Sequence, residues 1–253
     1  MTYLPFGDRV MPWTKPIRAC RDLLHRAFDA ATKVGPFTFV VFSGDGMTTN
    51  LLAAGDPLLD AQRQAESSLE IAKRARFGLC DLNSPQLALI KTLRGQTPEF
   101  GCFNDEQFDE HQFERRVSRN RALAVAECRY WIRKLQARFF AGDYAAAVEA
   151  SSRVVPLLWT SLGAFEEAEY EFYGGLARAA SCDRAESDNR HRHMDALRAH
   201  HDRVDELAAN CAENFGTRAA LLKAEIARIE GRELDAEHLY EQSIRSAQAN
   251  GFV

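Results

Sequence analysis

Several signals that identify common protein classes are missing from this sequence of 253 residues. No apolar run approaches the roughly 18 residues that a membrane-spanning helix needs, and the first residues lack the layout of a signal peptide. Lysine and arginine number 32 against 36 aspartates and glutamates, so no charge excess favours binding to nucleic acid or to an anionic membrane. We therefore expect a soluble, cytoplasmic protein.

Recognisable catalytic and metal-binding motifs are also missing. The sequence has no GxSxG, HExxH or Cys–His catalytic signature, and none of its six cysteines lies in a CxxC pair or at zinc-knuckle spacing. Residues 43–48, SGDGMT, contain two glycines but lack the frame and lysine of a P-loop. We expect these glycines to allow close helix packing or a kink. We expect no catalysis, metal or cofactor, and mostly buried, reduced cysteines.

Two clusters of titratable residues are better explained by helices than by chemistry. The histidines are His191, His193, His200 and His201. Two of them share a helical face seven residues apart, roughly 10.5 Å along the axis, which is too far for one metal ion. The glutamates are Glu166, Glu167, Glu169 and Glu171. We expect them in the first turns of a helix, where the dipole favours negative charge, with no nucleophile or metal in register.

A recurring helical pattern is what the sequence does contain. Its clearest instance reads YWIRKLQARFFAGDYAAAVEA. Trp131, Leu135 and Phe139 share one helical face. Gly142 suits a turn with positive φ, and Asp143 is placed to cap the next helix. The stretch therefore predicts a helix, a tight turn and a second helix.

Similar apolar stripes recur with a period of roughly 40–49 residues. Further glycine turns are expected at Gly55 and Gly231, and no segment reads as a β-strand. The stripes begin at positions 20, 61, 147, 196 and 236, and their partner helices are expected at about 37–54, 82–94, 121–141, 164–180 and 215–230. The pattern resembles the tetratricopeptide (TPR) class. We predict a single all-α domain over 1–253, a right-handed solenoid of about eleven helices in which each repeat contacts only its neighbours.

The irregular segments carry separate expectations. Residues 1–16 read as an extended lead-in with Trp13 packed on the first helix. Residues 96–120 read as an insertion with one short helix, either a functional or mobile loop or a spacer on the convex face. Residues 183–193 read as a polar connection. Phe252 is expected to be unpacked after a last helix without a polar cap, which suggests a fragment of a longer chain.

Several segments resemble the helical-repeat region of very large bacterial signalling proteins. In that family a protein-kinase-like domain and a P-loop ATPase module precede the TPR-like region, and a GAF domain and a sensor histidine kinase follow it. The matching segments include YWIRKLQARFFAGDYAAA, FYGGLARAA, NLLAAGDPL, LIKTLRGQTPEFG and AEIARIEGRELDAEHLYEQSIRSAQANGFV. The resemblance implies a non-catalytic interaction region that docks a partner protein or a neighbouring domain in signal transduction.

A groove on the first helices of the hairpins is the expected binding site. Its lining is predicted to be Arg129, Arg133, Tyr170, Tyr173 and Arg218. Arginine and tyrosine there would suit an acidic or extended peptide. The alternatives are a passive spacer, a small-molecule sensor with a pocket walled by Trp131, Trp159 and Tyr173, and an enzyme whose site no motif reveals.

Overall fold

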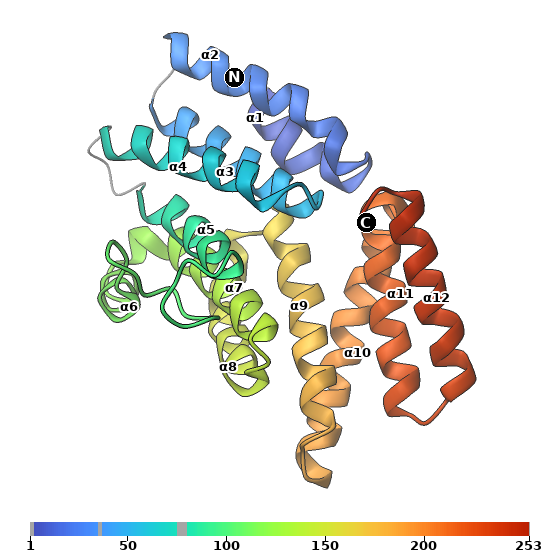
Figure 1. Ribbon diagram of the computed structural model, residues 1–253. Coiled ribbons are helices and arrows are strands. Elements are labelled where there is room, and N and C mark those ends of the chain that lie inside the picture. Colours follow the sequence, from blue (N-terminus) through green and yellow to red (C-terminus); the bar gives the residue numbers. More distant parts are fainter. Residues whose placement is uncertain (1–2, 35–36, 75–79, 253) are drawn as a thin grey trace.

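The structure is a computed structural model that describes residues 3–34, 37–74 and 80–252 (Figure 1). Over these residues the chain forms twelve α-helices and no β-strand, which confirms the all-α class. Residues 35–36 are Gly-Pro, a pair that predicts the end of a helix, and they lie outside the described residues. The α-helices are α1 Tyr3–Pro5, α2 Arg21–Val34, α3 Phe37–Ala53, α4 Leu58–Arg74, α5 Cys80–Leu93, α6 Glu110–Ser118, α7 Ala124–Phe140, α8 Tyr144–Val154, α9 Phe165–Cys182, α10 Ser187–Asn210, α11 Ala212–Ile229 and α12 Glu233–Ala249.

Two irregular segments differ from the sequence prediction. The lead-in is not extended, because α1 continues into the short helical turns Phe6–Val10 and Met11–Trp13. The polar stretch at 183–193 is not a connection along its whole length, since α10 begins at Ser187. Its side chains are mostly exposed. A polar composition is therefore compatible with a solvated helix face as well as with a loop.

The glycine turns between paired helices are confirmed. Gly142 has a φ of +73°, a conformation that is strained for other residues, and its amide donates to the Phe139 carbonyl at 3.0 Å. The Asp143 carboxylate then accepts from the Ala146 amide at 3.2 Å and caps α8. Local sequence alone is enough to define these hairpins.

The hairpins pack so that α3, α5, α7, α9 and α11 follow one another in one layer, each in contact with the next. Their partners, such as α4, α8, α10 and α12, lie against them (Figure 1). Gly44 on α3 allows a close approach to α4, since a Cβ there would lie 2.9 Å from the Ser68 Cβ. The expected role of this glycine in close helix packing is confirmed.

The first and last hairpins are joined by direct contacts. The Asn214 carboxamide at the start of α11 accepts from the Ile17 amide at 2.8 Å and donates to the Pro12 carbonyl at 2.7 Å. Trp13 stacks on Phe215, with ring centroids 5.6 Å apart, and packs against the apolar cluster that also contains Ile17. The prediction that each repeat contacts only its neighbours is therefore wrong for these hairpins.

Arg18 makes a second connection between these hairpins, at the C-terminal end of α12. Its guanidinium donates to the carbonyls of Asn250 at 3.0 Å and Gly251 at 2.7 Å. The group also lies 5.6 Å from the centre of the Phe252 ring. Phe252 was expected to be unpacked, but it is partly buried against the cluster that contains Ile17 and Phe215.

Candidate functional site

The expected insertion is present and is firmly anchored. A loop at 94–109 leads from α5 to the short helix α6, as predicted. The Gly101 amide donates to the Thr92 hydroxyl at 2.8 Å, and the Phe103 amide donates to the buried Glu110 carboxylate at 3.0 Å. Glu110 in turn lies 3.2 Å from the ammonium group of Lys134 on α7. These bonds tie the loop at both ends to the neighbouring helices.

Aromatic packing fixes the same insertion to the core. Phe103, Phe108 and Phe113 occur every five residues, which matches neither helix nor strand. All three rings gather around the buried ring of Tyr130, at centroid distances of 5.9, 6.5 and 4.9 Å. The insertion is therefore part of the core and not a loose spacer.

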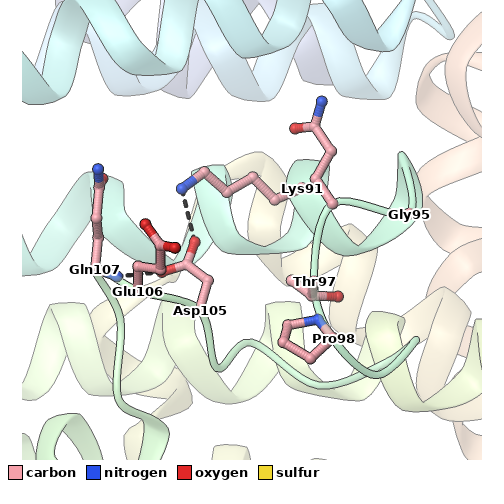
Figure 2. Close-up of a pocket in the computed structure, with 8 residues that line it drawn as sticks. Lys91, Gly95, Thr97, Pro98, Asp105, Glu106 and Gln107 are labelled. Carbon is pink, nitrogen blue, oxygen red and sulfur yellow. Dashed lines mark hydrogen bonds and ion pairs between the residues drawn. The ribbon is translucent and has the colours of Figure 1, made fainter.

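An open cleft lies beside this loop, because α6 does not pair with α5. Helix α6 packs on α7, and the loop at 94–109 covers the flank of α5 instead. Three adjoining hollows of about 470, 100 and 280 Å³ open between α4, α5 and the loop. We call them together the α5 cleft; Figure 2 shows the largest. The lining comprises Glu66, Leu69, Glu70, Lys73, Ser84, Leu87, Ala88, Lys91, Gly95, Gln96, Thr97, Pro98, Asp105, Glu106, Gln107 and Phe108.

An ion pair and a tight turn hold the loop wall of the α5 cleft in place. The Lys91 ammonium group donates to the Asp105 carboxylate at 2.7 Å (Figure 2). The other carboxylate oxygen accepts from the amides of Gln107 at 2.7 Å and Phe108 at 2.8 Å. Burial alone would raise the pKa of Asp105, but Lys91 and these amides outweigh it and lower the pKa. The carboxylate is thus a fixed part of the wall.

The rest of the lining combines an apolar floor with charged edges. Leu69 and Leu87 are buried at the floor, and Phe108 closes it from the loop side. Glu66 and Glu70 project from α4, while Glu106 projects from the loop and has no hydrogen-bond or ion-pair partner within the described part of the chain. Such a lining provides contacts for apolar and charged groups at once.

The predicted groove residues do not line this cleft, and most of them are not on the surface. Arg129, Arg133 and Tyr170 are only 3%, 1% and 7% exposed. Arg218 and Tyr173 are partly buried. Arg129, Arg133 and Tyr170 therefore do not form the accessible groove that was predicted. The two arginines face Asp45 and Glu166 on neighbouring helices of the layer, and the Tyr170 ring packs against His200 of α10.

The two arginines of α7 belong to a cluster that we call the inner charge network, comprising Asp45, Thr49, Arg129, Arg133 and Glu166. Arg129 forms an ion pair with Asp45 of α3 and lies 3.8 Å from Glu166 of α9. The guanidinium group of Arg133 lies 3.2 Å from Glu166, which also accepts from the Thr49 hydroxyl at 2.8 Å. Each charge in this network therefore has an opposite charge beside it.

Electrostatics within the inner charge network favour the ionised glutamate. Burial by itself would raise the pKa of Glu166. The charges of Arg129 and Arg133 and the hydrogen bond from Thr49 outweigh burial and lower the pKa to about 2. The network joins α3, α7 and α9.

The remaining groove candidates are also occupied within the fold. Arg218 donates to Glu169 at 2.6 Å and lies over the rings of Phe165 and Phe172, at 5.2 and 5.1 Å. Tyr173 packs against Phe172, with ring centroids 5.2 Å apart, and burial raises its pKa. Arg218 thus links α11 to α9, whereas Tyr173 also packs against Phe139 and Phe140 of α7.

The three aromatic residues expected to line the pocket of a small-molecule sensor differ in their surroundings. Trp159 is 61% exposed, Trp131 packs against Tyr130, and Tyr173 packs against other rings on α7 and α9. Among the described residues no ring contact joins the three.

The histidine and glutamate clusters are distributed over helix faces. His200 lies four residues after Ala196, on the apolar stripe that begins there, and is buried as this helical spacing indicates. Its Nδ1 lies 2.6 Å from Glu171. His193 lies 3.3 Å from the guanidinium of Arg178. Within the described ranges, no three His, Cys, Asp or Glu side chains are grouped so that they could hold a metal ion.

Five of the six cysteines are free and buried, as expected. They are Cys20, Cys102, Cys128, Cys182 and Cys211. Burial is the main cause that raises the pKa of the Cys20 thiol to about 12. The side chain of Cys80 lies outside the described residues.

Sequence reasoning did not identify the α5 cleft. The only local signal was the segment FNDEQF, in which Asp105 can accept from the amides two and three residues later.

No helix in the described part of the chain is long and apolar enough to cross a membrane. Comparison with family models, curated proteins and solved structures finds no match to this chain.

Proposed function

We propose that this chain is a non-catalytic interaction domain that docks an extended segment of a partner protein, or of another domain of its own chain, in the α5 cleft. The observation that carries the proposal is the shape and lining of the cleft. Its three hollows adjoin along α5, with an apolar floor, charged edges and an anchored loop as one wall. An elongated, partly apolar surface of this kind suits a peptide segment better than a compact metabolite.

The proposed setting is a large cytoplasmic signalling protein of bacteria. The supporting observation is the sequence resemblance to the helical-repeat region of proteins that combine an ATPase module with a sensor histidine kinase. We further propose that the stacked hairpins form a right-handed, TPR-like solenoid, supported by the succession of contacts from α3 through α5, α7 and α9 to α11. Docking in the cleft would then couple this domain to kinase output.

Selection from a random-peptide display library tests the docking proposal. Gln107 lines all three hollows and is exposed, so Gln107→Trp fills the α5 cleft without replacing a buried side chain. The matched control is Gln242→Trp, an exposed position on α12. This helix packs against α11 and lies far from α4 and α5 in Figure 1.

We expect peptides selected on the unchanged protein to bind the Gln242→Trp variant equally well. Their affinity for the Gln107→Trp variant should fall by about tenfold or more, because the bulky ring occupies the cleft. Circular dichroism checks that both variants remain folded. Selected peptides that bind all three proteins equally would overturn the proposed site.

A further inference from the structure

We propose that the α5 cleft selects an extended segment with one aliphatic anchor between two basic side chains. This inference rests on the proposed docking function and specifies its ligand class. It follows from the order of the three hollows, from the apolar floor of the middle one, and from the sign of the charges at the two ends.

The lining residues place the smallest hollow in the middle. The hollow of about 470 Å³ and the hollow of about 280 Å³ share only Lys91 and Gln107. Besides these two residues, the hollow of about 100 Å³ shares Asp105 with the hollow of about 470 Å³, and it shares Leu69 and Leu87 with the hollow of about 280 Å³. A segment that follows the cleft therefore crosses the small hollow between the two larger ones.

The middle hollow is suited to one aliphatic side chain. Its floor is formed by the buried Leu69, Leu87 and Ala88, with Phe108 at the loop side. Phe108 is held by Phe113, with centroids 5.1 Å apart, so this side of the hollow is preformed. Burying an aliphatic side chain here removes apolar surface from water on both molecules, which supplies the anchor for binding.

The two ends of the cleft carry more negative than positive charge. Glu66 and Glu70 lie at the α4 end, and Glu106 lies at the loop end. The only ammonium groups of the lining are Lys73 and Lys91, which are already paired with Glu70 at 3.2 Å and Asp105 at 2.7 Å.

The pairing leaves one carboxylate at each end without a cationic partner. Glu106 has no partner within the described ranges, and Glu66 accepts only from the carboxamide of Gln62, at 2.8 Å. A basic side chain on each side of the anchor therefore meets an available carboxylate, and an acidic one meets repulsion. The charge of this site is the reverse of the predicted arginine groove, which favoured an acidic peptide.

The test uses the same peptide selection and two charge-reversal substitutions. Glu66 and Glu106 are both exposed, so the double variant E66K/E106K changes the charge of the cleft without burying a charge. The matched control is E149K, another exposed glutamate, which lies on α8. Binding of a labelled selected peptide is followed by fluorescence anisotropy at low and high salt.

We expect selected peptides to combine Lys or Arg with an aliphatic residue. The double variant should bind them about tenfold more weakly, with a smaller dependence on salt, whereas E149K should bind them normally. Replacing the aliphatic anchor of the peptide by serine should also weaken binding by about tenfold.

The possible failures are distinguishable. Acidic or uncharged peptides that lose binding to the Gln107→Trp variant would overturn the ligand class while docking in the cleft remains. If no selected peptide is sensitive to the Gln107→Trp substitution, both the ligand class and the docking site are wrong.

Discussion

The inner charge network and the α5 cleft are both built from ion pairs, but the pairs face different surroundings. In the inner charge network the side chains of Arg133 and Glu166 are 1% and 3% exposed. In the cleft, Lys91 and Asp105 are 18% and 13% exposed, and the other charged groups project into solvent. Removing one partner from a buried pair leaves a desolvated charge, whereas water compensates for the loss near the surface. The first region should therefore determine stability, and the second is available for recognition.

The largest expected effect comes from removing an arginine of the inner charge network. The Arg129→Met substitution keeps much of the side-chain volume but leaves Asp45 buried without its cationic partner. We expect the free energy of unfolding to fall by about 3–5 kcal/mol, measured by urea denaturation. This range is typical of breaking a buried ion pair from one side.

The matched substitution in the α5 cleft is Lys91→Met. It also removes the cation of an ion pair. We expect the free energy of unfolding to fall by less than about 1 kcal/mol, because solvent and the loop amides still reach Asp105. If the two substitutions destabilise the protein equally, the distinction between the two regions is wrong.

For Glu166→Gln we expect a smaller effect: the free energy of unfolding at neutral pH should fall by about 3 kcal/mol. The pKa of Glu166 is lowered from 4.5 to about 2, so its ionised form contributes stability above pH 4.5. That contribution is lost as pH falls from 4.5 towards 2. The difference in unfolding free energy between the unchanged protein and the variant should therefore narrow over this interval.

Urea denaturation at a series of pH values measures this narrowing. The control is Glu149→Gln, since Glu149 is exposed on α8 and its ion pair with Arg153 is solvated. A Glu166→Gln penalty that stays constant between pH 7 and the acid limit of the folded protein would contradict the assigned role of the charge.

A further effect, smaller than those of Arg129→Met and Glu166→Gln, concerns the anchoring of the cleft wall. Gly101 has a φ of +84°, and a Cβ there would lie 2.5 Å from the Ala141 Cβ. Gly101→Ala should destabilise the protein by about 2 kcal/mol and weaken peptide binding, because the loop must shift away from α7.

Gly142→Ala is the matched control for this substitution. Gly142 also has positive φ, but open space surrounds the position of its missing Cβ. Gly142→Ala should therefore lower the free energy of unfolding by about 1 kcal/mol, through backbone strain alone, and leave peptide binding unchanged. Equal losses of binding for both variants would show that the loop contact does not shape the cleft.

Local signals were sufficient for the helical hairpins but not for the site. Gly142 and Asp143 predicted a turn and a cap because both functions depend on the residue's own conformation and on atoms a few positions away. The buried position of His200 followed from helical periodicity in the same way. Such features need no knowledge of distant parts of the chain.

Burial of the arginines could not be read from the sequence, because their partners are far away along the chain. Arg129 faces away from the apolar stripe of its own helix, which normally means exposure. Here Asp45, 84 residues earlier, and Glu166, 37 residues later, cover it. The α5 cleft likewise depends on three phenylalanines meeting Tyr130, and no periodic rule indicates that meeting.

The contact of Arg18 with Asn250 and Gly251 bears on how the molecule folds and unfolds. In an open array of repeats, folding can start anywhere and terminal units fray first. Here the Arg18 guanidinium group binds two carbonyls that lie 232 and 233 residues later in the chain. Forming this contact between the first and last hairpins requires most of the chain to be folded already. Contacts of such sequence separation slow folding and make it more cooperative. Hydrogen exchange should accordingly show the helical turn Ile17–Cys20 and the C-terminal end of α12 opening together, as one unit.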